Sequence, residues 1–442
     1  MNAVIIAVLV MLILSLLRVN VVFALLLGAL AGGLSGGLSF TETLTSYTEG
    51  LGAGATIALS YAMLGGFAVA ISRTGIPELL VAGVLKMVNK EGEATRQNLA
   101  KALIIFALFS MAIFSQNLIP IHIAFIPLLV PPILHILNEL RIDRRLIAAV
   151  LTFGLTAPYI LLPYGFGLIF HEILATQMEL AGMPIDMADI PRAMVFPVAG
   201  LFLGLIIAVF VSYRKPRDYR QTEEAISIVE TPKRTASIKD VIVTVIALIA
   251  ALFAQIQSES MIIGALAGIL ILYIFGAMKW KEADDVLTAG MRMMAFIGFV
   301  MISANGFASV IQETGAIGTL VENAANVFGD QKGLAALAML IVGLFVTMGI
   351  GSSFSTIPII AAIFVPLSVE FGFSTLAIIA LIGTAGALGD AGSPASDSTL
   401  GPTAGLNVDG QHNHIWDTVV PTFLHYNIPL VIFGWLAVMF LG

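Results

Sequence analysis

The stretch Gly28-Ala-Leu-Ala-Gly32 recurs as Gly264-Ala-Leu-Ala-Gly268, 236 positions later. Two further matches follow in the same order at nearly the same offset, Ile71–Gly75 with Ile311–Gly315 and Ile119-Pro-Ile121 with Ile357-Pro-Ile359. In a chain rich in Gly, Ala and Ile one match could arise by chance, but three ordered matches at a constant offset favour an internal duplication. The sequence therefore predicts two homologous halves.

The boundary between the halves is the one long polar stretch of the chain. Residues 214–239 carry seven Lys/Arg and four Asp/Glu, whereas the sequence on either side is apolar. We therefore predict a first repeat at 1–213, a cytoplasmic polar linker at 214–239 and a second repeat at 240–442.

The composition excludes a soluble protein. Of the 442 residues, 58% are hydrophobic and only 11% are charged, whereas soluble domains carry roughly 25% charged residues. There is no cysteine, which excludes disulfides, thiolate metal sites and thiol catalysis. The prediction is an all-α polytopic membrane protein in which most apolar runs are long enough to span a bilayer.

Both halves show the same order of apolar runs: three single runs, a closely spaced pair, a run that contains a polar break and a final run. In the first half these lie at 3–17, 21–38, 55–72, 102–114 with 118–137, 146–170 and 193–213. In the second half they lie at 241–255, 261–278, 293–311, 334–350 with 356–369, 375–388 onward, and 421–441.

The Lys/Arg distribution decides how the closely spaced pair crosses the membrane. If the pair returns to the side it entered, 19 of the 21 Lys/Arg lie in the cytoplasm and only Arg192 and Lys332 lie outside. A single crossing would move Arg141, Arg144 and Arg145 outside, against the positive-inside rule. The pair is therefore a re-entrant hairpin or two full spans. About five crossings per half is an odd number, so the repeats must be inverted, as is typical of secondary transporters.

Polar residues interrupt the membrane segments at four places, two in each half. Irregular backbone at this depth must line a cavity or be buried in protein, and hydroxyl, amide and carbonyl oxygens suit an alkali cation. The breaks and hairpin tips hold Ser115, Gln116, Asn117, Thr156, Pro158, Pro163 and Tyr164 in the first half, and Ser352, Ser353, Ser355, Thr356, Ser393, Pro394, Ser396, Ser398 and Thr399 in the second. Promotion of helix packing is the alternative role for such clusters.

Asp390 and Asp397 are the only carboxylates inside the apolar segments. A charge at the bilayer centre costs at least ~2.5 kcal/mol on insertion scales, so such residues usually mark an ion pathway. The preceding run, 375–388, reaches about 21 Å as a helix, which places the break inside the membrane. A loop at the membrane surface is the alternative interpretation.

The stretch Gly389-Asp390-x-x-Ser393-Pro394-x-Ser396-Asp397-Ser398-Thr399 resembles a motif of the NhaC-type Na+/H+ antiporters in the ion transporter superfamily. Ser398 replaces a threonine of that motif and keeps the hydroxyl. The resemblance extends over nearly the whole chain and is nearest to a branch of Na+/H+ antiporter family proteins, some of which are regarded as histidine permeases. It implies a homodimer with a scaffold and an elevator-like transport part, in which the hairpin tips face two unequal cation sites.

The cation ligands expected on this basis are Asp390, Asp397, Ser396, Ser398, Thr399, Ser352, Ser353, Ser355, Thr356, Ser115 and Asn117. The expected solute-binding residues are Gln116, Asn117, Thr156, Pro158, Tyr164, Asn305, Ser393 and Pro394. His122 follows a hairpin tip and is a weaker candidate for a proton shuttle. His412 and His414 have no carboxylate at ligand spacing, so no transition metal is expected.

Two other classes compete with a transporter. An intramembrane aspartyl protease needs two carboxylates on different helices, whereas both aspartates here lie on one break. A channel would use symmetric rings of carbonyls or charges. The Gly-rich stretches form no nucleotide-binding unit, and nothing indicates nucleic-acid binding.

The sequence therefore predicts a transporter rather than an enzyme. We expect a cation-coupled carrier that is driven by Na+ and/or H+ and needs no other cofactor. It is predicted to lie in the bacterial inner membrane, in contact with lipids. We expect the solute to be a small amino acid such as histidine, with Na+/H+ exchange without an organic solute as the alternative.

Overall fold

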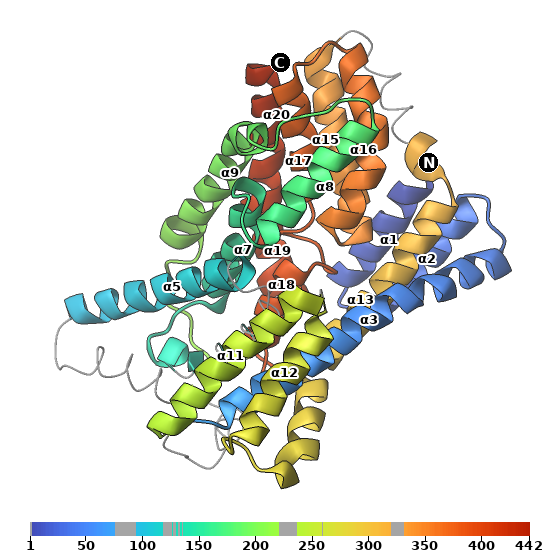
Figure 1. Ribbon diagram of the computed structural model, residues 1–442. Helices are drawn as coiled ribbons and strands as arrows, with labels where there is room; N and C mark the ends of the chain where they lie inside the picture. The colour runs from blue at the N-terminus through green and yellow to red at the C-terminus, as the bar shows by residue number, and fades with distance from the viewer. Residues whose placement is uncertain are drawn as a thin grey trace.

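The computed structural model describes residues 2–75, 94–117, 126, 130, 133–134, 136–220, 237–258, 260–319 and 331–442. Within these ranges the chain forms helices joined by short turns, with no β-strand (Figure 1). The predicted all-α class is therefore confirmed.

The helices of the first predicted repeat are α1 (Ala3–Leu16), α2 (Val21–Ser35), α3 (Phe40–Ser72), α5 (Ala94–Asn117), α7 (Arg144–Leu161), α8 (Phe166–Leu180) and α9 (Asp189–Ile207), which continues into the π-helical turn η1 (Ala208–Ser212). Those of the second are α11 (Ile238–Ser258), α12 (Met261–Ile274), the 3-10 turn η2 (Trp280–Glu282), α13 (Ala283–Glu313), α15 (Lys332–Ile350), α16 (Ser353–Glu370), α17 (Thr375–Ala387) and α18 (Asp397–Leu406). The last helix is continuous through η3 (His414–Val419), α19 (Val420–Thr422), η4 (Phe423–Asn427) and α20 (Ile428–Leu441).

Helices α3 and α13 pack along each other and are much longer than their apolar runs (Figure 1). Each begins at least ten residues before the run predicted at 55–72 or 293–311. In α3 a capping box stabilises this polar extension: the Glu42 N–H donates to Ser39 Oγ (3.2 Å), and the Ser39 N–H donates to the Glu42 carboxylate (2.7 Å). Hydropathy alone misses such a helix start.

Glycines allow the close approach of α3 and α13. A Cβ added to Gly290 would lie 2.1 Å from the Gly66 nitrogen and 2.3 Å from the Gly65 carbonyl carbon. A Cβ on Gly54 would lie 2.5 Å from Ile302 Cα. These contacts involve backbone atoms, so the helices could not relieve them by turning a side chain. Small residues at such crossings are the usual means by which membrane helices pack closely.

We expect Gly290→Ala to lower the Tm of the purified protein by several degrees, because the added methyl group forces α3 and α13 apart. Gly52→Ala is the matched control, since a Cβ at Gly52 on α3 meets nothing within 4 Å. Alanine is the better helix former by about 1 kcal/mol, so this control should leave Tm unchanged or raise it. Equal thermal unfolding curves for the two variants would contradict the close crossing.

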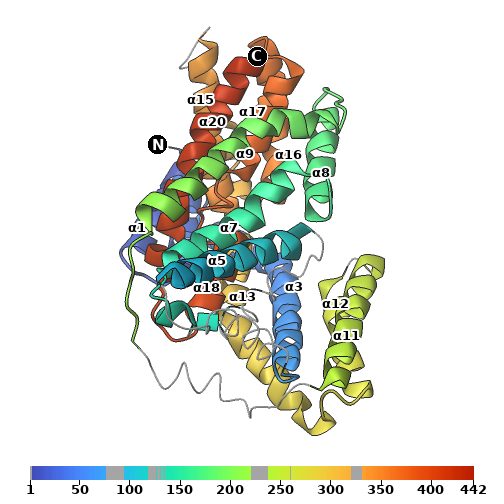
Figure 2. The ribbon, with the colours of Figure 1, turned by 90° about the vertical axis from the view of Figure 1, so that its left-hand side faces the viewer.

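The described residues form two hydrophobic clusters. The larger cluster joins α1 to α3, α5, α7 to α9, α13 and α15 to α20. The smaller one lies between the C-terminal part of α3 and the pair α11 and α12, and it includes Phe67, Ala247 and Leu272. Figure 2 shows α11 and α12 as a pair beside α3. The predicted site segments belong to the larger cluster.

Several helix contacts recur when the two halves are exchanged. Helix α1 packs on α2 as α11 packs on α12, and α2 packs on α13 as α12 packs on α3. Helix α7 packs on α9 as α17 packs on α20. This is the pattern expected for the repeats at 1–213 and 240–442, whose inverted relation remains a prediction.

The polar interruptions of the second half lie where predicted. Helices α15 and α16 meet at Gly351-Ser352, and α17 and α18 are separated by residues 388–396. In the first half the break, predicted from Thr156 through Gly165, is shorter in the structure, at 162–165, because Pro158 is accommodated inside α7. Of the first-half hairpin, the structure describes the first arm, α5, and parts of the predicted second arm, at 126, 130, 133–134 and 136–137.

Seven helices among the described residues are long and apolar enough to cross a membrane, which makes the chain a multi-pass membrane protein. They cover Phe40–Ile71, Arg144–Leu161, Asp189–Ser212, Ile238–Gln255, Met294–Glu313, Lys332–Ile350 and His414–Leu441.

The predicted topology places Asp218 in the cytoplasm and Asp186 outside. Both side chains are exposed, and the chain has no native cysteine. An impermeant thiol reagent applied to intact cells should therefore label a cysteine at position 186 but reach position 218 only after the cells are opened. The reverse pattern would overturn the Lys/Arg assignment.

Candidate functional site

The break between α17 and α18 is a turn held by side-chain hydrogen bonds. Gly389 has φ +85°, a conformation that glycine adopts at little cost. Thr399 Oγ1 donates to the Ser393 carbonyl (2.6 Å), and Ser393 Oγ donates to the Met348 carbonyl on α15 (3.3 Å). Ser396 caps α18 by accepting from the Ser398 N–H (3.1 Å). The predicted residues Ser393 and Thr399 therefore shape the turn with their hydroxyls.

Asp390 lies in this turn and is buried, with 9% of its surface exposed. Its Oδ2 accepts hydrogen bonds from Tyr159 Oη on α7 (2.6 Å) and from Ser398 Oγ (3.2 Å). Its Oδ1 accepts one from Ser396 Oγ (2.8 Å). Tyr159 Oη also lies 3.0 Å from Ser353 Oγ in the hairpin α15–α16. One carboxylate thus connects the second-half break, the second-half hairpin and α7.

Asp397 begins α18 and is held from a different direction. Its Oδ1 accepts a hydrogen bond of 2.6 Å from Tyr61 Oη on α3. The Tyr61 side chain is almost fully buried, with 1% of its surface exposed. Each aspartate therefore has its own tyrosine donor, and both tyrosines come from the first half. Sequence reasoning missed Tyr61 and Tyr159, because nothing in their local sequence marks them as partners of a distant break.

Three buried polar atoms near the breaks have no hydrogen-bond partner among the described residues. They are Thr156 Oγ1 on α7, Thr384 Oγ1 on α17 and Asn427 Nδ2 in η4. All three residues are fully buried. The Asn427 amide lies against the turn, where its Oδ1 accepts a long bond of 3.4 Å from the Gly389 N–H. Buried polar groups normally have partners, so these atoms are candidates for contact with a bound ion or solute.

Several predicted site residues do not join the aspartates. Tyr164 lies in the turn after α7 with 70% of its surface exposed. Asn305 donates to the Met301 carbonyl of its own helix (2.9 Å), and Thr356 donates likewise to the Ser352 carbonyl (2.8 Å). Pro158 is buried inside α7, where its carbonyl accepts from the Leu162 N–H.

The structure leaves other predicted residues undecided. Ser115, Gln116 and Asn117 end α5 and Ser355 lies in α16, but their side chains are not described. His122 lies outside the described residues. Among the described residues, no three His, Cys, Asp or Glu side chains gather as a metal site.

Below the break, a buried ion pair joins α7 to the end of α18. Arg144 makes two hydrogen bonds of 2.6 Å to the two oxygens of Asp409, and it also donates to the Leu406 carbonyl (2.9 Å). Arg144 is fully buried, and its guanidinium lies 4.3 Å from the centre of the Tyr219 ring. Burial alone raises the pKa of Asp409, but the hydrogen bonds and charge of Arg144 outweigh it and lower that pKa below its ordinary value.

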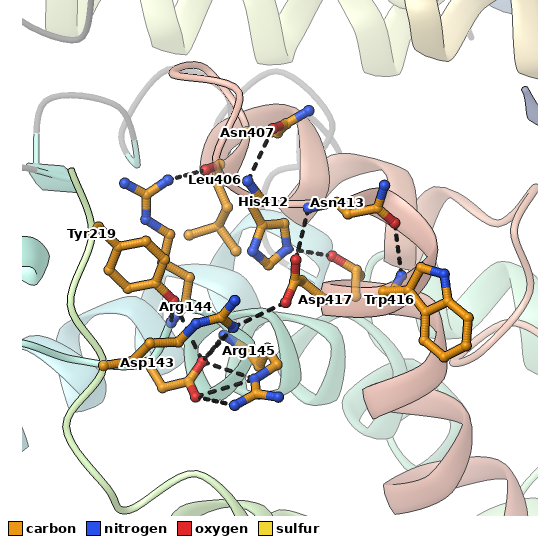
Figure 3. Close-up of polar contacts among 12 residues, drawn as sticks. Asp143, Arg144, Arg145, Tyr219, Leu406, Asn407, His412, Asn413, Trp416 and Asp417 are labelled. Atoms are coloured by element: carbon orange, nitrogen blue, oxygen red, sulfur yellow. Dashed lines mark hydrogen bonds and ion pairs between the residues drawn. The ribbon is translucent and has the colours of Figure 1, made fainter. Parts of the chain in front are cut away.

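The start of the predicted linker is docked on this region. The Tyr219 hydroxyl accepts from the Arg144 N–H (2.9 Å; Figure 3), and Arg217 pairs with Asp417 (3.0 Å). The Arg220 N–H donates a hydrogen bond to Gln411 Oε1, and Gln411 Nε2 donates one to the Arg220 carbonyl, both at 2.7 Å. Arg217 and Tyr219, at the start of the predicted polar linker, are therefore partly buried and lie across the base of α7 and η3.

A chain of buried hydrogen bonds runs from this base to the break. His412 Nε2 lies 2.7 Å from Thr418 Oγ1, which lies 2.9 Å from Thr403 Oγ1. Thr403 Oγ1 lies 2.8 Å from His414 Nδ1, and His414 Nε2 lies 2.8 Å from the Pro394 carbonyl. Burial lowers the pKa of His412 to about 3, so this histidine is neutral at pH 7. Figure 3 shows His412 beside Asp417.

The chain matches the Na+/H+ antiporter family over residues 150–435 and a second family of Na+-H+ antiporters over residues 2–88. It is 56% identical to an uncharacterized membrane protein of Vibrio parahaemolyticus, over 100% of both chains. It is 55% identical to the candidate amino acid transporter YuiF of Bacillus subtilis, again over 100% of both chains. Among solved structures, the YdaH transporter of Alcanivorax borkumensis is similar at 13% identity and a TM-score of 0.44, over 90% of this chain and 88% of that one, a likeness on which no assignment rests.

Proposed function

The chain belongs to the Na+/H+ antiporter family, and from this premise we propose that it is a cation-coupled carrier of a small amino acid in the bacterial inner membrane. That it is a multi-pass transporter follows from the family and its helices; the solute, the coupling ion and the mechanism are the proposal. The observation that carries it is the pair of aspartates at a helix break, Asp390 buried and Asp397 half-buried, each held by its own tyrosine.

Asp390 and Asp397 are the proposed coupling groups. A buried carboxylate is stable when it is neutralised by a bound cation or by a proton. Na+ and H+ therefore compete for the same oxygens, and the hydroxyls of Ser396 and Ser398 are close enough to Asp390 to contribute further ligands. Such competition is the simplest basis for exchanging one cation for the other.

The solute is proposed to lie between the break and the C-terminal helix. The Asn427 Nδ2 group lies beside Gly392, where a Cβ would approach it to 2.7 Å, and it has a free donor. A zwitterion could place its carboxylate at this amide and its ammonium group toward the aspartates. The 55% identity to a candidate amino acid transporter supports this choice of solute.

We further propose an elevator-like movement in a homodimer, as the family resemblance implies. The moving part would contain the hairpin α15–α16 and the broken helix α17–α18, because Asp390 and Asp397, the proposed cation ligands, lie in the broken helix. The hydrogen bonds from Tyr61 to Asp397 and from Tyr159 to Asp390 would form or break as this part moves. The stationary part would then contain the α3–α13 pair.

Proteoliposomes test the proposal. With imposed Na+ or proton gradients, labelled histidine and other small amino acids should accumulate only when a gradient is present. Calorimetry should show that amino acid and Na+ each raise the affinity for the other by the same factor, as linkage requires. If no amino acid binds while Na+ alone shifts the internal pH, the alternative holds and the protein exchanges Na+ for H+ without an organic solute.

A further inference from the structure

A pocket of about 630 Å³ lies between α5, α7 and the end of α9, away from the aspartates. Its floor is apolar and includes Ile105, Phe109, Val150 and Leu205. Its volume falls within the range of roughly 300–1,000 Å³ that is usual for small-molecule sites. Nothing in the proposed transport mechanism uses it.

One end of this pocket is strongly basic. Lys101, Arg141, Arg214 and Lys215 all line it, and among the described lining residues Asp143 is the only acidic one. Asp143 is already neutralised by Arg145, at 2.6 Å. Arg141 pairs with the exposed Asp218, a solvated contact of little strength. The pocket therefore presents a net positive charge above an apolar floor, which is the chemistry that recognises an amphiphilic anion.

The other side of the pocket includes exposed aromatic rings, one of them in the candidate membrane span Asp189–Ser212. Phe106 and Phe210 line the pocket, yet each exposes about two thirds of its surface (65% and 66%). Phe202 and Val211 on the same helical segment as Phe210 are exposed apolar residues as well. A soluble anion would leave these rings uncovered, whereas an acyl chain would cover them.

We propose that this pocket binds an anionic phospholipid, with the phosphate among Lys101, Arg214 and Lys215 and an acyl chain along Phe106 and Phe210. The basic end lies on the side predicted to be cytoplasmic, where anionic lipids attract Lys and Arg. Since the pocket is bounded by η1 and the 213–216 segment, a bound lipid would also fasten the start of the linker against α5 and α7.

Native mass spectrometry of the purified protein tests the proposal without any transport measurement, so its result is independent of the proposed function. Phosphatidylglycerol should remain bound at detergent concentrations that remove phosphatidylcholine. The triple variant Lys101→Gln/Arg214→Gln/Lys215→Gln should weaken phosphatidylglycerol binding on the order of 100-fold, because each cation near an anionic headgroup contributes roughly a factor of five.

The matched control is Lys279→Gln/Lys281→Gln/Arg292→Gln, which removes three exposed cations on the same predicted side but outside the pocket. It should retain the lipid. Ala102→Trp fills the pocket and keeps every charge, so it should also lose the lipid. This variant tests the proposal if the triple variant does not fold.

Equal loss of lipid in the control variant would overturn the proposal, because binding would then follow total charge. Retention of phosphatidylglycerol by Ala102→Trp would overturn it as well. If soluble glycerol phosphate binds as tightly as phosphatidylglycerol, the pocket is a site for a free anion and not for a lipid.

Discussion

Asp397→Asn is expected to abolish gradient-driven transport while the protein still folds and inserts. The amide preserves the shape of the side chain and can still accept the Tyr61 hydrogen bond of 2.6 Å, but it cannot neutralise a cation or bind a proton. A desolvated cation that loses its counter-charge loses roughly 3 kcal/mol or more, a decrease on the order of 100-fold in affinity. Uptake into proteoliposomes and Na+ binding by calorimetry measure the two effects separately.

Asp390→Asn should have the same effect on transport and a larger one on the protein's stability, because both Asp390 oxygens accept hydrogen bonds, one from Tyr159 on α7 and one from Ser396 in the break. Normal Na+-dependent transport by both variants would remove this pair from the mechanism.

The tyrosines provide a graded comparison. Tyr61→Phe removes one hydrogen bond to a carboxylate, worth ~1.5–3 kcal/mol, and leaves the charge in place. It should therefore weaken transport without abolishing it. Tyr273→Phe is the matched control, since the Tyr273 hydroxyl on α12 has no hydrogen-bond partner among the described residues.

The second-half break could be predicted from the sequence because its determinants are local. Gly389 permits the turn, Ser396 caps the next helix, and the two aspartates stand out in an apolar chain. The hairpin turn at Gly351-Ser352 was predicted for the same reason. Local chemistry of this kind fixes where a helix ends, whatever it later packs against.

The partners of the aspartates could not be predicted in this way. Tyr61 is 336 positions from Asp397, and Tyr159 is 231 positions from Asp390. A tyrosine in an apolar helix also reads as an interface or packing residue, and only tertiary packing gives its hydroxyl a carboxylate. Asn427 was missed similarly, since it lies inside the last helix and became notable only through its unpaired amide.

Arg144 illustrates a different limit. The Lys/Arg distribution placed it in the cytoplasm together with Arg141 and Arg145, and the structure buries it completely against Asp409. The two residues are 265 positions apart. A count of charges predicts the side of the membrane without showing which cation is buried, because burial depends on the arrival of the end of α18.

Arg144→Met is therefore expected to cause the largest loss of stability of any single change considered for this chain. The variant leaves Asp409 buried without its partner, which costs ~3–5 kcal/mol, whereas removing an exposed partner costs less than ~1 kcal/mol. Arg192→Met is the control, because Arg192 pairs with Asp189 at 3.0 Å with 73% of its side chain exposed. Thermal unfolding in detergent, followed by tryptophan fluorescence, should show a much lower Tm for Arg144→Met only.

The ion pair also predicts how stability depends on pH. Because the pKa of Asp409 is lowered in the folded protein, its contribution is fully present above the ordinary carboxyl pKa of about 4 and is lost as the pH falls through the lower folded value. The Tm of the wild-type chain should therefore drop as the pH falls below about 4. Asp409→Asn should start from a lower Tm and lose this part of the acid dependence. An equally steep acid dependence in Asp409→Asn would mean that other carboxylates, and not this pair, limit stability in acid.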